Sequence, residues 1–147
     1  MTVKLALYQP DIAPNVGAII RLGACMSVPV HVIEPCGFPF SLHSVRRQVM
    51  DYGDRAEVVR HDSWDRFRAA QTGRLIAMTT HADACLWDFA FAPGDVVLMG
   101  RETAGLPPDV HAACDARLAI PMAPGTRSLN IAIAAGIAVA EAVRQLR

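Results

Sequence analysis

The chain has 147 residues and a mass of 15.8 kDa, which suits one compact domain with its own core and is too little for two. Hydrophobic residues make up 52% of the sequence and charged residues 19%, a balance that excludes intrinsic disorder. The formal net charge is +0, so overall charge neither indicates nor excludes a nucleic-acid partner.

Short apolar runs alternate with helical patterns along the chain. Strands are predicted at residues 3–8, 29–34, 56–60, 74–80, 96–100 and 117–120. Helices are predicted at residues 15–27, 63–72, 107–113 and about 129–146, with a short helical turn at 83–88. Several strands are apolar on both faces, which is typical of a parallel sheet covered by helices on each side. The alternation predicts an α/β fold whose ligand site lies beyond the carboxyl ends of the strands.

The last predicted helix is apolar nearly all round from Ile131 to Val143, apart from Glu141. A helix without a polar face must be covered on every side, and a chain of this length seldom does that alone. Together with the low charge content, this helix predicts a homodimer in which a second subunit supplies the missing cover.

The four cysteines, Cys25, Cys36, Cys85 and Cys114, include no C-x-x-C pair, and no paired histidines complete a zinc site. We interpret them as small buried hydrophobic residues in a reducing compartment and expect no metal. The chain starts directly with strand-like residues, and its longest apolar stretch is half of the ~20 residues needed to cross a bilayer. We therefore expect a soluble, cytoplasmic protein with no membrane partner.

Three loops that follow predicted strands carry the polar and glycine residues of interest. They read Q-P-D-I-A-P-N-V-G-A-I-I-R at residues 9–21, G-R-E-T-A-G-L-P-P at 100–108 and I-P-M-A-P-G-T-R-S-L-N at 120–130. The glycines of the second loop would let a ligand approach the backbone closely. Ser128 in the third loop is placed to cap the final helix. Taken singly, each loop also fits an ordinary helix start or a tight turn.

Together and in this order, the three loops resemble the three motifs of the SPOUT methyltransferases, the α/β-knot family that uses S-adenosylmethionine. N-x-G-x-I-x-R, G-x-E-x-x-G-L-P and I-P-M…S-L-N are similar to the branch that methylates ribose 2′-oxygens. Within it, the likeness is strongest to the group acting on cytidine or modified uridine at position 34 of tRNA. L-A-L-Y-Q-P at residues 5–10, H-V-I-E-P-C-G-F at 31–38 and R-R-Q-V-M-D-Y at 46–52 extend the resemblance over essentially the whole chain.

The chain departs from this group at two places. The group usually has Pro where Arg101 stands and Arg where Ala104 stands. It usually reads Leu-Ser-Asn after the third motif, whereas this chain has Ile131-Ala132-Ile133. Because these differences lie in the RNA-facing loop and the final helix, they bear on the choice of RNA target rather than on the cofactor site.

The resemblance implies one domain over residues 1–147, a parallel sheet with flanking helices and a C-terminal deep trefoil knot. The knotted, cofactor-binding part would cover about residues 75–147. Met78, Gly100, Ile120 and Ser128 would line the pocket for S-adenosylmethionine, with Gly105 and Leu129 beside them. The product of the cofactor would be S-adenosylhomocysteine, and no metal would be needed.

The resemblance also implies that Arg21 is the catalytic residue. A free guanidinium stays protonated at neutral pH, so a role as general base needs burial or nearby positive charge. Alternatively, a charged Arg21 binds the adjacent phosphate and orients the ribose hydroxyl. For RNA binding we single out Arg46 and Arg47, with Tyr52 stacking on a base, against the alternative of a solvated helix face. In the family the RNA site forms across the dimer interface.

Three other interpretations remain open at this point. The same fold would equally serve methylation of another tRNA or ribosomal-RNA ribose. A knotted RNA-binding protein without catalytic activity is a second alternative, against which the intact Asn15, Arg21, Glu102, Ser128 and Asn130 argue. The third is an unrelated flavodoxin-like or nucleotide-binding α/β domain, which three ordered motif matches disfavour.

Overall fold

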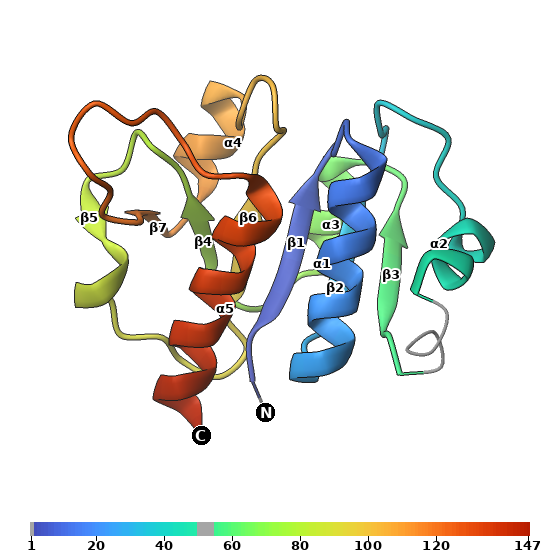
Figure 1. Ribbon diagram of the computed structural model, residues 1–147, viewed down its shortest axis with the longest axis horizontal. Coiled ribbons are helices and arrows are strands. Elements are labelled where there is room, and N and C mark those ends of the chain that lie inside the picture. Colours follow the sequence, from blue (N-terminus) through green and yellow to red (C-terminus); the bar gives the residue numbers. More distant parts are fainter. Residues whose placement is uncertain (1, 50–54) are drawn as a thin grey trace.

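A computed structural model describes residues 2–49 and 55–147, without the side chains of Arg46, Gln48 and Val49. In these residues a single parallel sheet has the strand order β3-β2-β1-β6-β4-β7-β5 (Figure 1). The strands are β1 (Lys4–Tyr8), β2 (Val30–Ile33), β3 (Val58–His61), β4 (Leu75–Met78), β5 (Ala84–Cys85), β6 (Val96–Met99) and β7 (Ala116–Ala119). The predicted α/β class with a parallel sheet is confirmed.

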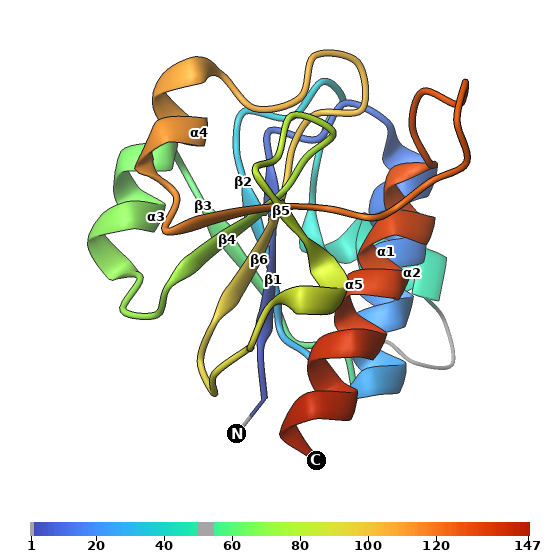
Figure 2. The ribbon, with the colours of Figure 1, turned by 90° about the vertical axis from the view of Figure 1, so that its left-hand side faces the viewer.

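Helices cover both faces of the sheet, as Figure 2 shows in edge view. One face carries α1 (Ala13–Met26), α2 (Leu42–Val49) and α5 (Ile131–Leu146), and the other carries α3 (Trp64–Ala70) and α4 (Pro108–Ala113). A 3-10 turn, η2, covers Leu86–Asp88. The core is divided accordingly, with one apolar cluster between the sheet and α1 and α5 and another around Phe67 of α3 and Val110 of α4.

The predicted elements agree with the structure to within about two residues at each end, with two omissions. Helix α2 was not predicted, although Leu42, Val45 and Val49 have helical spacing. The expected helical turn at 83–88 is correct only in its second half, because its first half forms the short strand β5. Among the described residues, no helix is long and apolar enough to cross a membrane. The trefoil knot implied by the resemblance remains a prediction.

The starts of two helices differ from the sequence prediction. Ser128 does not cap α5; Asn130 does, because its Oδ1 accepts hydrogen bonds from the backbone N–H groups of Ala132 (2.8 Å) and Ile133 (3.3 Å). Helix α1 begins at Ala13, so Pro14 lies in its first turn. A proline is tolerated there because the missing N–H would have no partner inside the helix.

The cysteines are less buried than predicted. Only Cys114 is buried, Cys36 and Cys85 are half-buried, and Cys25 is exposed. Cys25 is exposed because the buried face of α1 runs through Val16, Ile19 and Gly23, and a residue two positions after Gly23 points about 200° away from it.

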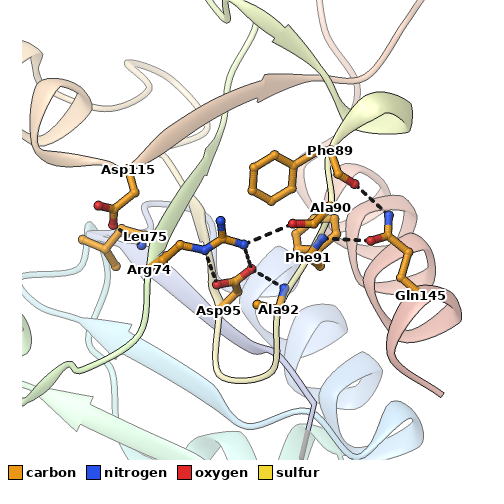
Figure 3. Close-up of polar contacts among 9 residues, drawn as sticks. All are labelled: Arg74, Leu75, Phe89, Ala90, Phe91, Ala92, Asp95, Asp115 and Gln145. Atoms are coloured by element: carbon orange, nitrogen blue, oxygen red, sulfur yellow. Dashed lines mark hydrogen bonds and ion pairs between the residues drawn. The ribbon is translucent and has the colours of Figure 1, made fainter.

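A polar network joins α5 and the segments that lead into β4 and β6 (Figure 3). The carboxylate of Asp95, which is 2% exposed, accepts bonds from Nε and Nη2 of Arg74 (2.8 and 2.7 Å) and from the Ala92 N–H (2.8 Å). Gln145 of α5 accepts from the Phe91 N–H and donates to the Phe89 carbonyl. These contacts fix the amino-terminal end of the sheet and leave its carboxyl end free for a site.

Candidate functional site

A cavity of about 950 Å³ lies at the carboxyl ends of β4, β6 and β7, where an open α/β sheet is expected to bind its ligand. Its walls are residues 78–81 at the end of β4, residues 99–106 at the end of β6, and residues 119, 120 and 122–131 at the end of β7. Ile12 and Asn15, at the start of α1, also line the cavity. All three motif-bearing loops of the sequence therefore contribute to one cavity.

The structure brings the four predicted cofactor residues together. Met78, Gly100, Ile120 and Ser128 all line this cavity, and so do Gly105 and Leu129, which were predicted to lie beside them. These residues come from three separate loops, which meet because β4 lies between β6 and β7 in the sheet.

The second loop folds back on itself at the cavity wall. The Gly105 N–H donates to the Arg101 carbonyl (2.9 Å), and the Arg101 N–H donates to the Gly105 carbonyl (3.3 Å). A Cβ atom on Gly100 would lie 2.8 Å from the carbonyl carbon of Gly105, closer than side-chain atoms approach backbone. Gly105 has a φ of +66°, a left-handed conformation that favours glycine. Both glycines are therefore required by the shape of the loop.

The third loop connects to the first loop at the mouth of the cavity. Residues 121–130 are exposed throughout, and Asn130 ends the loop by capping α5. The Nδ2 of Asn130 also donates to Oδ1 of Asn15 (3.1 Å), although the two residues are 115 positions apart. A single side chain thus holds both the start of α5 and the start of α1.

The first and second loops follow β1 and β6, which are neighbours in the sheet, and they are joined by polar contacts. The Asp11 N–H donates to Oε2 of Glu102 (3.0 Å), and the Thr103 hydroxyl donates to Oδ2 of Asp11. Arg101 donates to Oε1 of Gln9, and its guanidinium carbon lies 5.3 Å from the centre of the Tyr8 ring. Sequence reasoning did not find these pairs, since their members are about 90 residues apart and only the strand order brings them together.

The two carboxyl groups of this contact differ in acidity. Burial, and then the hydrogen bond with Asp11, raises the pKa of Glu102. The hydrogen bonds with Glu102 and then with Thr103 lower the pKa of Asp11. Glu102 therefore holds a proton more strongly than its neighbour does.

Arg21 does not lie among the described residues that line the cavity. It is exposed on α1, six residues after Asn15, which corresponds to ~9 Å along the helix axis. Arg47 is exposed on α2, whereas the side chain of Arg46 and the whole of Tyr52 lie outside the described residues. The roles of these residues in catalysis and RNA binding remain predictions.

The lining suits a ligand that combines a flat apolar ring with polar groups. Met78, Leu106, Ile120 and Leu129 supply apolar side chains, and the loops between them offer backbone N–H and C=O groups. In the part of the chain that the structure describes, no three His, Cys, Asp or Glu side chains are grouped so as to hold a metal ion.

Comparison with known proteins gives consistent matches. A family model described as the SpoU rRNA Methylase family matches residues 2–140. A tRNA (cytidine(34)-2′-O)-methyltransferase of Beijerinckia indica subsp. indica is 51% identical over 145 residues, covering 97% of this chain and 91% of the relative. A solved structure concerned with 2-OH methylation of C/U34 on tRNA has a TM-score of 0.91 at 39% identity, covering 98% of this chain and 95% of the other.

A second solved structure, an AdoMet-bound rRNA methyltransferase from Sinorhizobium meliloti, is 28% identical with a TM-score of 0.83. The match covers 99% of this chain and 57% of the Sinorhizobium chain. The family match over nearly the whole sequence and the agreement in fold lead to one conclusion: the chain belongs to the SpoU rRNA methylase family of methyltransferases.

Proposed function

We propose that this protein transfers a methyl group from S-adenosylmethionine to the ribose 2′-oxygen of nucleotide 34, the wobble nucleotide, of tRNA. The observation that carries the proposal is the single cavity that all three motif loops line. The tRNA target is supported by the Beijerinckia relative, named for cytidine 34, and by the solved structure concerned with C/U34. The substrate nucleotide would be a cytidine or a modified uridine.

Met78, Gly100, Ile120 and Ser128 would hold S-adenosylmethionine, which supplies a methyl group on a good sulfonium leaving group. The residues present fit an adenosyl group because the cavity pairs apolar side chains with glycine backbone. At Gly105 a Cβ atom would meet nothing within 4 Å, so the backbone there lies open to a ligand. The AdoMet-bound Sinorhizobium relative supports this assignment.

The protein has two tasks in the transfer: to align the ribose hydroxyl and to accept or direct its proton. When the new C–O bond forms and the C–S bond breaks, the hydroxyl proton must leave. Alignment alone supplies up to ~7–11 kcal/mol of barrier reduction in ideal cases. Arg21 would take the proton or bind the adjacent phosphate, and Arg46 and Arg47 would contact the RNA backbone.

We also propose that the active form is a homodimer whose RNA site lies across the subunit interface. Helix α5 is covered on one side by its own chain, through Ala135, Ala138, Val139 and Ala142. Its other side leaves Ile133 55% exposed. A second copy that packs against α5 would bury this apolar surface.

The test is nucleoside mapping by mass spectrometry after the protein is incubated with bulk tRNA and isotope-labelled S-adenosylmethionine. We expect label on the 2′-oxygen of nucleotide 34 and at no other tRNA position. A parallel reaction with ribosomal RNA tests the alternative that the protein methylates ribosomal RNA instead of tRNA. Label on ribosomal RNA alone, or on another tRNA nucleotide, would overturn the assignment to position 34. A tRNA substrate also agrees with the cytoplasmic location expected from the sequence.

A further inference from the structure

We propose that Glu102 and Asp11 share a single proton, carried by Glu102, and that this proton locks the first loop to the second at the cavity. Glu102 is then a positioning residue in its neutral, acid form. The inference deepens the proposed function and rests on it, because the two loops shape the cavity assigned to the methyl donor.

The hydrogen-bond pattern leaves one oxygen of each carboxyl group unused. Oε2 of Glu102 accepts from the Asp11 N–H (3.0 Å), and Oδ2 of Asp11 accepts from the Thr103 hydroxyl. The remaining oxygens, Oε1 of Glu102 and Oδ1 of Asp11, are shielded from solvent and have no hydrogen-bond donor among the described residues. Buried acceptors without a donor are rare and destabilise the folded state.

A single proton would give both of these oxygens a hydrogen-bond partner. The side chains of Glu102 and Asp11 lie within hydrogen-bonding reach of each other, so a proton on Oε1 of Glu102 could be donated to the Asp11 carboxylate. Two ionised carboxylates in this position would repel each other, so such pairs tend to keep one proton. The raised pKa of Glu102 and the lowered pKa of Asp11 agree with a proton on Glu102.

Three described groups near the pair are already accounted for by other contacts or by their charge state. Arg101, on the same loop, is engaged with Gln9 and with the Tyr8 ring. Cys36, from the segment after β2, has its pKa raised to about 11 by burial and by Glu34, so its thiol is neutral. Arg60 near that thiol is paired with Glu34 at 2.7 Å.

The contact between Asp11 and Glu102 affects the shape of the cavity because of where these two residues lie. Asp11 stands two residues before the start of α1, and its loop leads to the cavity-lining Asn15. Glu102 stands inside the folded-back loop between Gly100 and Gly105. As the pH rises through the raised pKa of Glu102, the proton is lost and the like charges separate the loops. We therefore expect methyl transfer to decline as the pH rises through that raised pKa.

The test compares Glu102→Ala with Glu102→Gln. An alanine removes the lock, so we expect kcat/KM for methyl transfer to fall at least ~10-fold, in the range seen when positioning groups are lost. A glutamine imitates the neutral acid, since its amide N–H donates to Asp11 and its carbonyl accepts from the Asp11 N–H. It should recover most of that loss and abolish the decline with rising pH. Glu57→Gln, at an exposed glutamate far from the cavity, is the matched control for the charge change.

Two kinetic results would overturn the inference: Glu102→Gln as impaired as Glu102→Ala, or a decline with rising pH that persists in Glu102→Gln. The pKa of Glu102 can also be measured directly in the parent protein, by following its ¹³C carboxyl signal by NMR across pH. We expect it to titrate above the range of a glutamate in a model peptide, and titration in or below that range would contradict the proposal. If the parent protein transfers no methyl group, the proposed function fails, and this titration alone decides the shared proton.

Discussion

Arg21 is the residue whose chemistry the proposed reaction depends on most directly. We expect Arg21→Ala to lower kcat for tRNA methylation by ~10²–10⁴-fold, the usual loss when a group that handles the proton is removed. Arg21→Lys should restore little, because an ammonium lacks the planar, two-pronged geometry of a guanidinium. Single-turnover kinetics with labelled cofactor would measure both. Transfer by Arg21→Ala at the parental rate would remove Arg21 from the mechanism.

A second residue-scale feature is the pair of stacked histidines on neighbouring strands β2 and β3. Nδ1 of His31 lies 2.8 Å from Nε2 of His61, and the rings stack at 14° beside Phe67. Burial, and then the nearby His61 and Lys4, lowers the pKa of His31 to about 4. Burial also lowers the pKa of His61. The pair is therefore neutral at pH 7.

Because His31 binds a proton less readily in the folded chain than in the unfolded one, acid destabilises the fold. Stability is complete above the unfolded pKa of 6.5 and is lost as the pH falls from 6.5 toward 4. We expect a loss of about 1–2 kcal/mol over that interval, since partial exposure of the ring screens the effect. Urea unfolding at several pH values would measure it. His31→Phe should flatten this dependence, whereas His43→Phe on exposed α2 should retain it.

At the scale of elements, Asn130 connects the third loop, α5 and α1. Asn130→Ala removes the cap of α5 and the bond to Asn15, so we expect about 1–2 kcal/mol lower stability. Asn15→Ala removes only the bond between the two side chains and should cost less. Both should weaken S-adenosylmethionine binding, measured by calorimetry, because each loosens the cavity mouth. Equal stability of Asn130→Ala and the parent would contradict the capping role.

The opposite end of the sheet depends on the Asp95 network of Figure 3. Asp95→Ala leaves the Ala92 N–H without its acceptor and the Arg74 guanidinium with only the Ala90 carbonyl. We expect it to lower the free energy of unfolding by about 2–3 kcal/mol, less than for a fully buried pair because Arg74 is 45% exposed. Asp83→Ala, at an exposed position, is the control and should change stability by less than about 0.5 kcal/mol.

For the whole molecule, the central prediction is that two copies associate through α5. Sedimentation should give twice the chain mass of 15.8 kDa. Ile133→Glu should reduce it to one chain mass, because it places a charge in the apolar contact. The monomer should tolerate this change, since an acidic residue in the first turn of a helix is favourable. Trp87→Glu, at another exposed apolar residue, should leave the mass unaltered. An active parent protein that sediments at one chain mass would contradict the dimer.

The fold and much of the candidate site were predictable from the sequence. Runs of successive apolar residues, such as 96–99 and 75–78, identify central strands. A strand that is buried on both faces is apolar at every position, and the local sequence alone shows this. The motif residues Gly100, Ile120 and Ser128 were assigned to one pocket, and they do line one cavity. The cap of α5 was misassigned to Ser128 because two capping residues lie within three positions, and only backbone geometry distinguishes them.

By itself, the sequence determined the parallel α/β architecture, the positions of three functional loops and the apolar character of the final helix. These features depend on residues that are close together in the chain. The tertiary structure decided which distant groups meet: Asp11 with Glu102 across 91 positions, and Asn15 with Asn130 across 115. It also decided which residues line the cavity, and Arg21 is not among the described ones that do. The reason is that such contacts follow from the order of strands in the sheet, where β6 pairs with β1, and no local pattern specifies that order.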